Sequence, residues 1–129
     1  MKIKTIKLKK KEDLRGALIQ NESAEVRNKM KHFFVSTSKP DVIRGQHYHT
    51  KKMEWFLVIK GTARIYFEDI KTHEKDNLNL DADSPQIVEV PSLIAHSIKN
   101  TGNEEMMLLA IVNEPLDEKN PDTFPYKVI

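Results

Sequence analysis

The chain alternates short apolar runs with turn-forming residues over most of its length. Runs of four to eight residues rich in β-branched and aromatic side chains, bounded by Gly, Pro, Asn or Asp, are typical of strands. This spacing predicts a β-sandwich or small barrel of about 8–11 strands. The predicted strands are Lys4–Lys9, Gly16–Gln20, His32–Thr37, Val42–His49, Trp55–Lys60, Arg64–Ile70, Gln86–Val90, His96–Asn100 and Met106–Val112.

Two segments depart from the strand pattern. Residues 22–31 predict either one short helix or a loop. The last sixteen residues, 114–129, contain three prolines and no periodicity, so we expect an extended tail that must pack on something to be ordered. Phe124 and Tyr126 are its expected anchors, whether the tail caps the sandwich or crosses to a second subunit.

Composition fits one domain over residues 1–129, with a hydrophobic fraction of 39% that argues against disorder. The chain has no cysteine, which fits a reducing cytoplasm and excludes thiolate metal sites. No apolar run approaches membrane-spanning length, so we expect a cytoplasmic protein with no membrane partner.

The net charge is only +2, and the basic excess lies at the start, where six of the first eleven residues are lysine. No aromatic-plus-Arg pattern accompanies these lysines, so a solvated edge strand is favoured over a nucleic-acid site.

The stretch RGQHYHTKKMEWFLVIKG, residues 44–61, holds two of the five histidines and a glutamate inside an apolar run. Side chains alternate along a strand, so His47 and His49 share a face with Cα atoms roughly 6.5–7 Å apart. If the two strands of this stretch pair as a hairpin, Glu54 folds back beside them. With His96, which opens a later strand, they form a donor set that suits Zn, Fe, Ni, Mn or Cu.

The alternative is that these four are separate, solvent-facing polar residues. We accept that interpretation for His32, beside a lysine, and for His73, in the charged turn KTHEKD. For His47, His49, Glu54 and His96 together we favour a metal site.

The same spacing resembles the cupin superfamily. HYH at 47–49, four residues, Glu54, six residues and Gly61 match its first motif, although Gly45 lies too close to be that motif's first glycine. Pro91, His96 and then Asn100 match the second, with Leu93 where the family usually has glycine. The resemblance implies an all-β cupin (double-stranded β-helix or jelly-roll) domain.

A narrower resemblance is carried by segments 13–20, 44–65 and 112–124. They are similar to the C-terminal cupin domain of a bifunctional epimerase/reductase that makes a capsular polysaccharide precursor; the reductase half, with its GxGxxG motif, is absent here. This implies a C3 epimerase of a UDP- or dTDP-linked 4-keto-6-deoxy sugar in bacterial surface-polysaccharide biosynthesis, acting through an enolate. The implied cofactor is a divalent metal, zinc first and Fe, Ni or Mn as alternatives, bound by His47, His49, Glu54 and His96.

Two related families give other expectations. The dTDP-4-keto-rhamnose 3,5-epimerases carry RGxHYQ, where the histidine matching His47 is a metal-free base. The dTDP-sugar 3,4-ketoisomerases carry RGxHAHK, where the residues matching His47 and His49 are both catalytic without metal; their PxxWHEM and YDETDY-type segments are absent here. A non-catalytic sugar-binding cupin is a further alternative, as is a metal-dependent dioxygenase or phosphosugar isomerase on the same fold.

The remaining roles follow from the chemistry. A histidine whose lone pair binds a metal cannot also take a proton, so with His47 and His49 as ligands the base must be another group. Lys52 is the candidate, with a solvated turn lysine as the alternative. Arg44 is expected to bind the diphosphate. The weaker candidates for substrate binding are Lys51, Arg64 and Asn100. We expect Trp55 in the core or an interface, and a homodimer.

Overall fold

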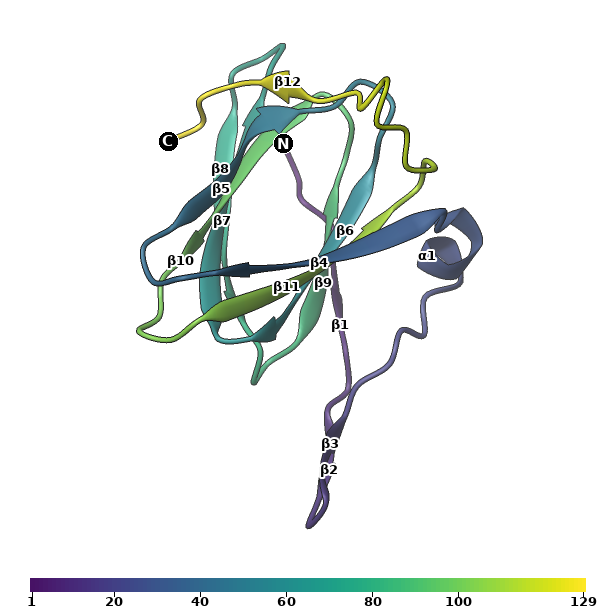
Figure 1. Cartoon of the computed structure of the whole chain (residues 1–129), viewed down its shortest axis with the longest axis vertical. Coiled ribbons are helices and arrows are strands. Elements are labelled where there is room, and N and C mark those ends of the chain that lie inside the picture. Colours follow the sequence, from purple (N-terminus) through teal and green to yellow (C-terminus); the bar gives the residue numbers. More distant parts are fainter.

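The computed structural model describes all of residues 1–129 and consists mainly of two antiparallel five-stranded sheets packed face to face (Figure 1). The first sheet has the order β1 (Thr5–Lys7), β9 (Gln86–Val90), β6 (Glu54–Lys60), β11 (Met106–Val112), β4 (His32–Ser38). The second has the order β12 (Phe124–Pro125), β5 (Ile43–Tyr48), β10 (Ile94–Asn100), β7 (Thr62–Asp69), β8 (Lys75–Asp81). The predicted all-β, cupin-type sandwich is confirmed.

Each of the nine predicted strands overlaps an observed strand. The prediction missed β2 (Lys11–Asp13), β12 and β8, whose sequence KDNLNLD is rich in residues that are depleted in strands. Pairing along the whole of β7 outweighs that poor local preference. The short-helix alternative for residues 22–31 is correct: α1 (Ala24–Lys29) begins after Ser23, whose hydroxyl accepts from the backbone of Val26.

The main core lies between the two sheets. Alternate residues of β7 point inward, and Ile65 and Phe67 are almost fully buried against Val88 and Ala110 of the opposite sheet. Trp55 lies on the outer face of the first sheet, where it packs in a second cluster with Val26 of α1. Trp55 was expected in the core or in an interface, and it lies in the core.

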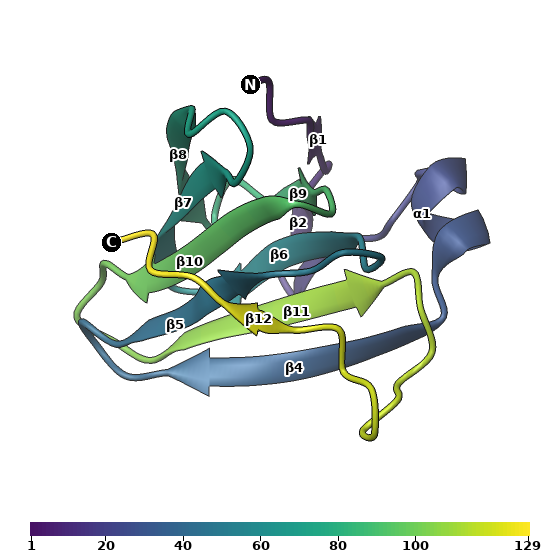
Figure 2. The same ribbon diagram turned by 90° about the horizontal axis from the view of Figure 1, so that it is seen from above.

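The C-terminal tail packs on its own chain. It runs across the end of the sandwich and adds β12 to the edge of β5 (Figure 2). Phe124 stacks on Tyr48 with ring centroids 5.4 Å apart. The hydroxyl of Tyr126 donates to Glu68, and its backbone N–H donates to the carbonyl of Gln46. Both expected anchors thus contact this chain.

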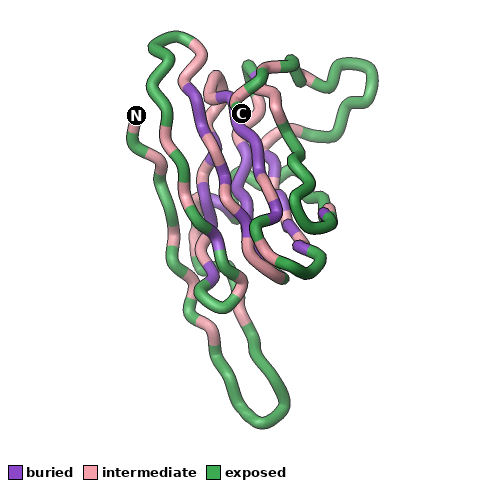
Figure 3. The backbone as a smooth tube through the Cα atoms, turned by 90° about the vertical axis from the view of Figure 1, so that its left-hand side faces the viewer, coloured by how far each residue is buried: buried purple, intermediate pink, exposed green.

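One element stands apart from the body. The hairpin of β2 and β3 (Gly16–Leu18) projects away from the sandwich, and every residue from 11 to 18 is exposed (Figure 3). This hairpin buries none of its strand residues against the sandwich. A two-stranded hairpin isolated in this way is only marginally stable in water. The single helix has six residues, and no helix is long and apolar enough to cross a membrane. The cytoplasmic location stays a prediction.

Candidate functional site

The four predicted ligands come together, but not through a hairpin. β5 and β6 belong to different sheets, and the connection after His49 crosses from one to the other, so the expected hairpin is wrong. Glu54 begins β6 and reaches His49 across the interior of the sandwich. One donor atom from each of His47, His49, Glu54 and His96 lies within 4.8 Å of the others.

A bulge in β5 lies directly before His47, which pairs with His96 of β10. The register shifts by one residue between the pairs His96 with His47 and Ser97 with Gly45. Gly45 has φ +93°, and a Cβ there would lie 2.8 Å from the carbonyl oxygen of His96. Only glycine therefore allows β5 to approach β10 this closely beside the cluster.

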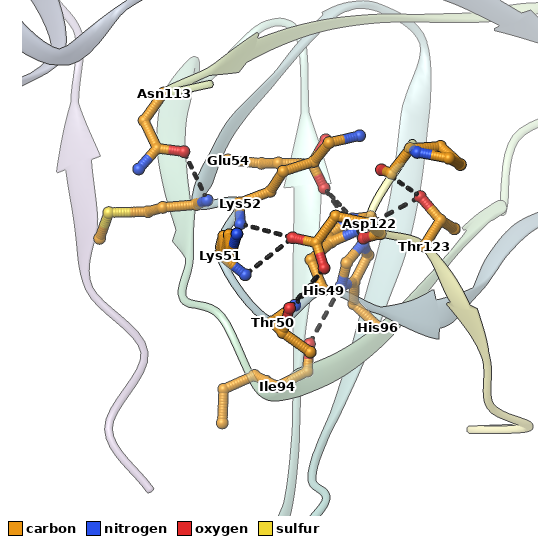
Figure 4. Close-up of polar contacts among 12 residues, drawn as sticks. His49, Thr50, Lys51, Lys52, Glu54, Ile94, His96, Asn113, Asp122 and Thr123 are labelled. Atoms are coloured by element: carbon orange, nitrogen blue, oxygen red, sulfur yellow. Dashed lines mark hydrogen bonds and ion pairs between the residues drawn. The ribbon is translucent and has the colours of Figure 1, made fainter. Parts of the chain in front are cut away.

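Backbone carbonyls orient two of the imidazoles (Figure 4). Nδ1 of His49 donates to the carbonyl of Asp122 at 2.7 Å, and Nδ1 of His96 donates to the carbonyl of Ile94 at 3.1 Å. Their Nε2 atoms face Glu54 Oε1, at 2.8 Å from His49 and 3.4 Å from His96. Metal-binding histidines are commonly oriented in this way, with one ring nitrogen donating to a carbonyl and the other turned toward the position of the ion.

The electrostatics of the cluster favour a charged carboxylate on Glu54 and a neutral imidazole on His47. Burial alone would raise the pKa of Glu54, but the hydrogen bond with His49 and the close imidazole of His96 hold that pKa well below its ordinary value. Burial, helped by the neighbouring imidazoles of His96 and His49, lowers the pKa of His47 to about 4. Burial also acts to lower the pKa of His49, yet its hydrogen bond and attraction to Glu54 leave that pKa raised.

These donors fit a divalent cation. Nε2 of His96 is buried and has no hydrogen-bond partner, and the ring of His47 makes no hydrogen bond within the protein. Three imidazoles and one carboxylate are a donor set for zinc or iron, and a bound cation would satisfy the unpartnered nitrogen of His96.

A cavity of about 290 Å³ opens beside the cluster. Arg44 and Lys52, two of the predicted substrate and catalytic residues, line it together with the four candidate ligands. Arg44 donates from Nε and Nη2 to the carbonyl of Thr37, and from Nε to the hydroxyl of Ser38, which leaves Nη1 free at an exposed position. The other lining residues are Phe34, Ser36, Gly45, Phe56, Ile98, Leu108 and Thr123.

Three residues proposed from sequence for substrate binding do not line this cavity. The guanidinium of Arg64 donates to Asn77 on the neighbouring strand. Asn100 is fully buried and donates to the carbonyls of Ser38 and Glu104. Lys51 is an exposed residue of the crossing loop, residues 49–53, which connects β5 to β6. The amide of Asn100 is fully used in shaping a turn, so its role here is structural, and Arg64 and Lys51 lose the geometric reason for the assignment.

Sequence reasoning missed two residues of the tail. Thr123 lines the cavity, and the carboxylate of Asp122 accepts hydrogen bonds from the crossing loop at Thr50, Lys51 and Lys52 (Figure 4). Burial would raise the pKa of Asp122, but these bonds, led by the Thr50 hydroxyl, hold it well below its ordinary value. The only sequence signal was the need of residues 114–129 for a surface to pack on.

Leu93 occupies the motif position where glycine was expected. It adopts φ +65°, the left-handed conformation that glycine would take readily. Its backbone N–H donates to the carbonyl of His49 at 2.7 Å, and the imidazole of His96 remains in the cluster. The turn is therefore formed with leucine in a conformation that leucine rarely adopts.

Comparison with known proteins gives a family and several relatives. The family model described as polysaccharide biosynthesis C-terminal domain matches residues 11–124. A curated relative, the UDP-2-acetamido-2,6-beta-L-arabino-hexul-4-ose reductase of Pseudomonas aeruginosa, is 40% identical over 96 residues, which are 74% of this chain and 26% of the relative. The chain thus spans about a quarter of that protein's length.

Solved structures agree with the fold. The capsular polysaccharide assembling protein CapF from Staphylococcus aureus matches with a TM-score of 0.74 and 30% identity, covering 94% of this chain and 33% of CapF. The sugar 3,4-ketoisomerase QdtA from Thermoanaerobacterium thermosaccharolyticum, solved with TDP, matches with a TM-score of 0.77 over 95% of this chain and 86% of QdtA. Its identity of 22% supports the fold alone.

Proposed function

The chain belongs to the polysaccharide biosynthesis C-terminal domain family, and from this premise we propose that it is an isomerase of nucleotide-linked sugars in surface-polysaccharide biosynthesis. Its substrate would be a 4-keto-6-deoxy sugar, epimerised at C3. The observation that carries this proposal is the buried cluster of His47, His49, Glu54 and His96 beside a cavity large enough for part of a sugar nucleotide. We take residues 1–129 as one domain, with 114–129 as its tail.

The reaction needs a base at C3 and stabilisation of the charge that develops at the C4 oxygen. A ketone at C4 acidifies the C3–H bond, and return of a proton to the opposite face inverts that carbon. His47, His49, Glu54 and His96 would hold a divalent cation, zinc first and Fe, Ni or Mn as alternatives. A bound cation supplies several kcal/mol of Lewis-acid stabilisation. Lys52 lines the same cavity, so we assign it the proton transfer.

Arg44 is the proposed contact for the diphosphate. Its backbone-anchored guanidinium lies at the cavity with Nη1 unused, and a planar guanidinium suits phosphate oxygens. The curated relative is named for a UDP-linked substrate and the solved ketoisomerase contains TDP, so both UDP and dTDP sugars are candidates.

The second candidate is a metal-free 3,4-ketoisomerase with His47 and His49 as acid and base. The observation in its favour is that the ring of His47 makes no hydrogen bond and faces the cavity. Its pKa of about 4 argues against it, because a general base works best when its pKa is near the operating pH. A neutral imidazole is, in contrast, what a metal ligand requires. A sugar-binding cupin without catalysis is the third candidate.

We propose a homodimer for the working protein. β4 is an edge strand of the first sheet, and Phe33 and Val35 on its outer face are 64% and 50% exposed. Phe34, which lies between them in the sequence, lines the cavity, so a second copy against β4 would also approach the site. The projecting β2–β3 hairpin, with Leu14 wholly exposed at its tip, is a second unsupported surface that a partner copy would cover.

The test is solvent exchange at C3. UDP- and dTDP-linked 4-keto-6-deoxyhexoses are incubated with the protein in deuterium oxide and followed by NMR. We expect deuterium at C3 together with inversion of that carbon. A 3-keto product would identify the ketoisomerase, and binding of the sugars without exchange would identify the non-catalytic cupin.

A further inference from the structure

A single residue of the tail, Asp122, contacts both the crossing loop and the cluster. Its carboxylate accepts hydrogen bonds from the N–H and hydroxyl of Thr50 at 3.0 and 2.5 Å. It also accepts from the N–H groups of Lys51 and Lys52 at 2.7 and 3.0 Å. Three successive backbone donors thus converge on one anion, an arrangement that fixes the conformation of the loop.

The same residue orients an imidazole. The backbone carbonyl of Asp122 accepts from Nδ1 of His49 at 2.7 Å, which turns Nε2 of that ring toward Glu54. Asp122 has φ +51°, a left-handed conformation that aspartate and asparagine tolerate better than most residues. In this conformation its side chain and its carbonyl both engage the segment around His49.

The rest of the tail keeps Asp122 in place. The side chain of Gln46, one residue before His47, accepts from the N–H groups of Val128 and Ile129 at 2.7 and 3.2 Å. Its own amide donates to the carbonyl of Ile129 at 2.6 Å. The segment that carries both histidines is therefore tied to the tail on either side of them.

We propose that Asp122 is a positioning residue, which holds the 50–52 loop and the ring of His49 in the geometry that ion binding needs. The metal part of this inference rests on the proposed function, whereas the orientation of His49 does not. Partners that orient a metal-binding histidine typically contribute a factor of about 10–100 to metal affinity. Removal of the Asp122 carboxylate should weaken metal binding by a factor in this range.

The experiment compares Asp122→Asn with Asp117→Asn. Asparagine tolerates the left-handed conformation but replaces one acceptor oxygen by an amide group that cannot face the loop donors. Asp117 is the matched control, because its carboxylate also accepts from two backbone N–H groups of the tail, at Lys119 and Asn120. Zn²⁺ affinity is measured by competition with a chelator, and exchange of the His49 Nδ1–H proton is measured by NMR in the metal-free protein.

The expected result is a Zn²⁺ affinity about 10–100-fold lower in Asp122→Asn, with faster exchange of the His49 proton, and no change in Asp117→Asn. Unchanged exchange in Asp122→Asn would overturn the positioning role. If the wild type binds no Zn²⁺, the metal-based function fails, while the exchange comparison still decides the role of Asp122. If Asp122→Asn does not fold, Thr50→Val, which removes one of the loop bonds, decides it: faster exchange supports the role, and unchanged exchange overturns it.

Discussion

Nε2 of His49 lies 2.8 Å from a carboxylate oxygen of Glu54, although His49 directly follows a strand of one sheet and Glu54 begins a strand of the other. The candidate site is therefore a contact between the two layers of the sandwich. Its geometry depends on the separation of the sheets. Any change that shifts one sheet against the other should alter the distances between the donor atoms of the cluster.

Loss of a candidate ligand should remove the metal. We expect His96→Ala to bind Zn²⁺ more than about 100-fold more weakly than the wild type, because a direct ligand contributes more than its outer partners do. His73→Ala is the control, since His73 lies on the surface by Glu68 and away from the cluster. Elemental analysis of the purified proteins gives the metal content. Equal metal in all three proteins would contradict the ligand assignment.

Gly45 should be intolerant of a side chain. A Cβ at this position meets the carbonyl of His96 at 2.8 Å and adds the cost of a left-handed residue, so we expect Gly45→Ala to lower the free energy of unfolding by about 3 kcal/mol. Urea unfolding measures the change.

Gly16→Ala provides the comparison. Gly16 also has a positive φ, +136°, but a Cβ there meets nothing within 4 Å. Its substitution should cost only about 1 kcal/mol of backbone strain. If the two variants lose the same stability, close approach of β5 to β10 does not explain the glycine.

The attachment of the tail should weaken in acid. The hydroxyl of Tyr126 donates to Glu68, and this bond, with that of His73, keeps the pKa of Glu68 below its ordinary value. A carboxyl whose pKa is lowered by folding stabilises the folded state above its unfolded pKa of about 4.3, and the stabilisation is lost as the pH falls through the folded pKa.

We therefore expect the NMR signals of residues 124–129 to shift towards those of a detached tail as the pH falls below about 4.3. Tyr126→Phe removes the hydroxyl, so its tail signals should depend less on pH over the same interval. Identical pH profiles for the two proteins would show that the contact with Glu68 does not hold the tail.

Oligomerisation should depend on the outer face of β4. Light scattering after size exclusion should give twice the chain mass of 15.0 kDa for the wild type. Phe33→Asp should shift the protein to the monomer, because it places a charge in the proposed apolar contact. Leu116→Asp is the control, as Leu116 is 66% exposed in the tail and not on β4. A monomeric wild type would refute the homodimer.

Local pattern predicted much of this molecule. The apolar alternation located nine strands, and the spacing of His47, His49, Glu54 and His96 indicated that they would meet. Alternation defines the face on which a side chain lies, but not the sheet that a strand joins. For that reason the expected hairpin between β5 and β6 was wrong although the residues that it was meant to bring together are together.

The remaining features depend on distant parts of the chain. Asp122 bonds to residues 70–73 positions earlier in the sequence, and no local pattern marks it as part of the site. Asn100 matched a sequence motif, which carries no information on burial, and its amide is used within the protein. β8 forms because β7 offers it a partner along its length.

The anchorage of the 50–52 loop by Asp122 also bears on how the protein is made. During translation, all four residues of the cluster leave the ribosome before the residue that fastens their loop. The sandwich can begin to form while the loop is still free, because domains fold as the chain emerges. The hydrogen bonds that anchor the loop can therefore form only after residue 122 has been synthesised.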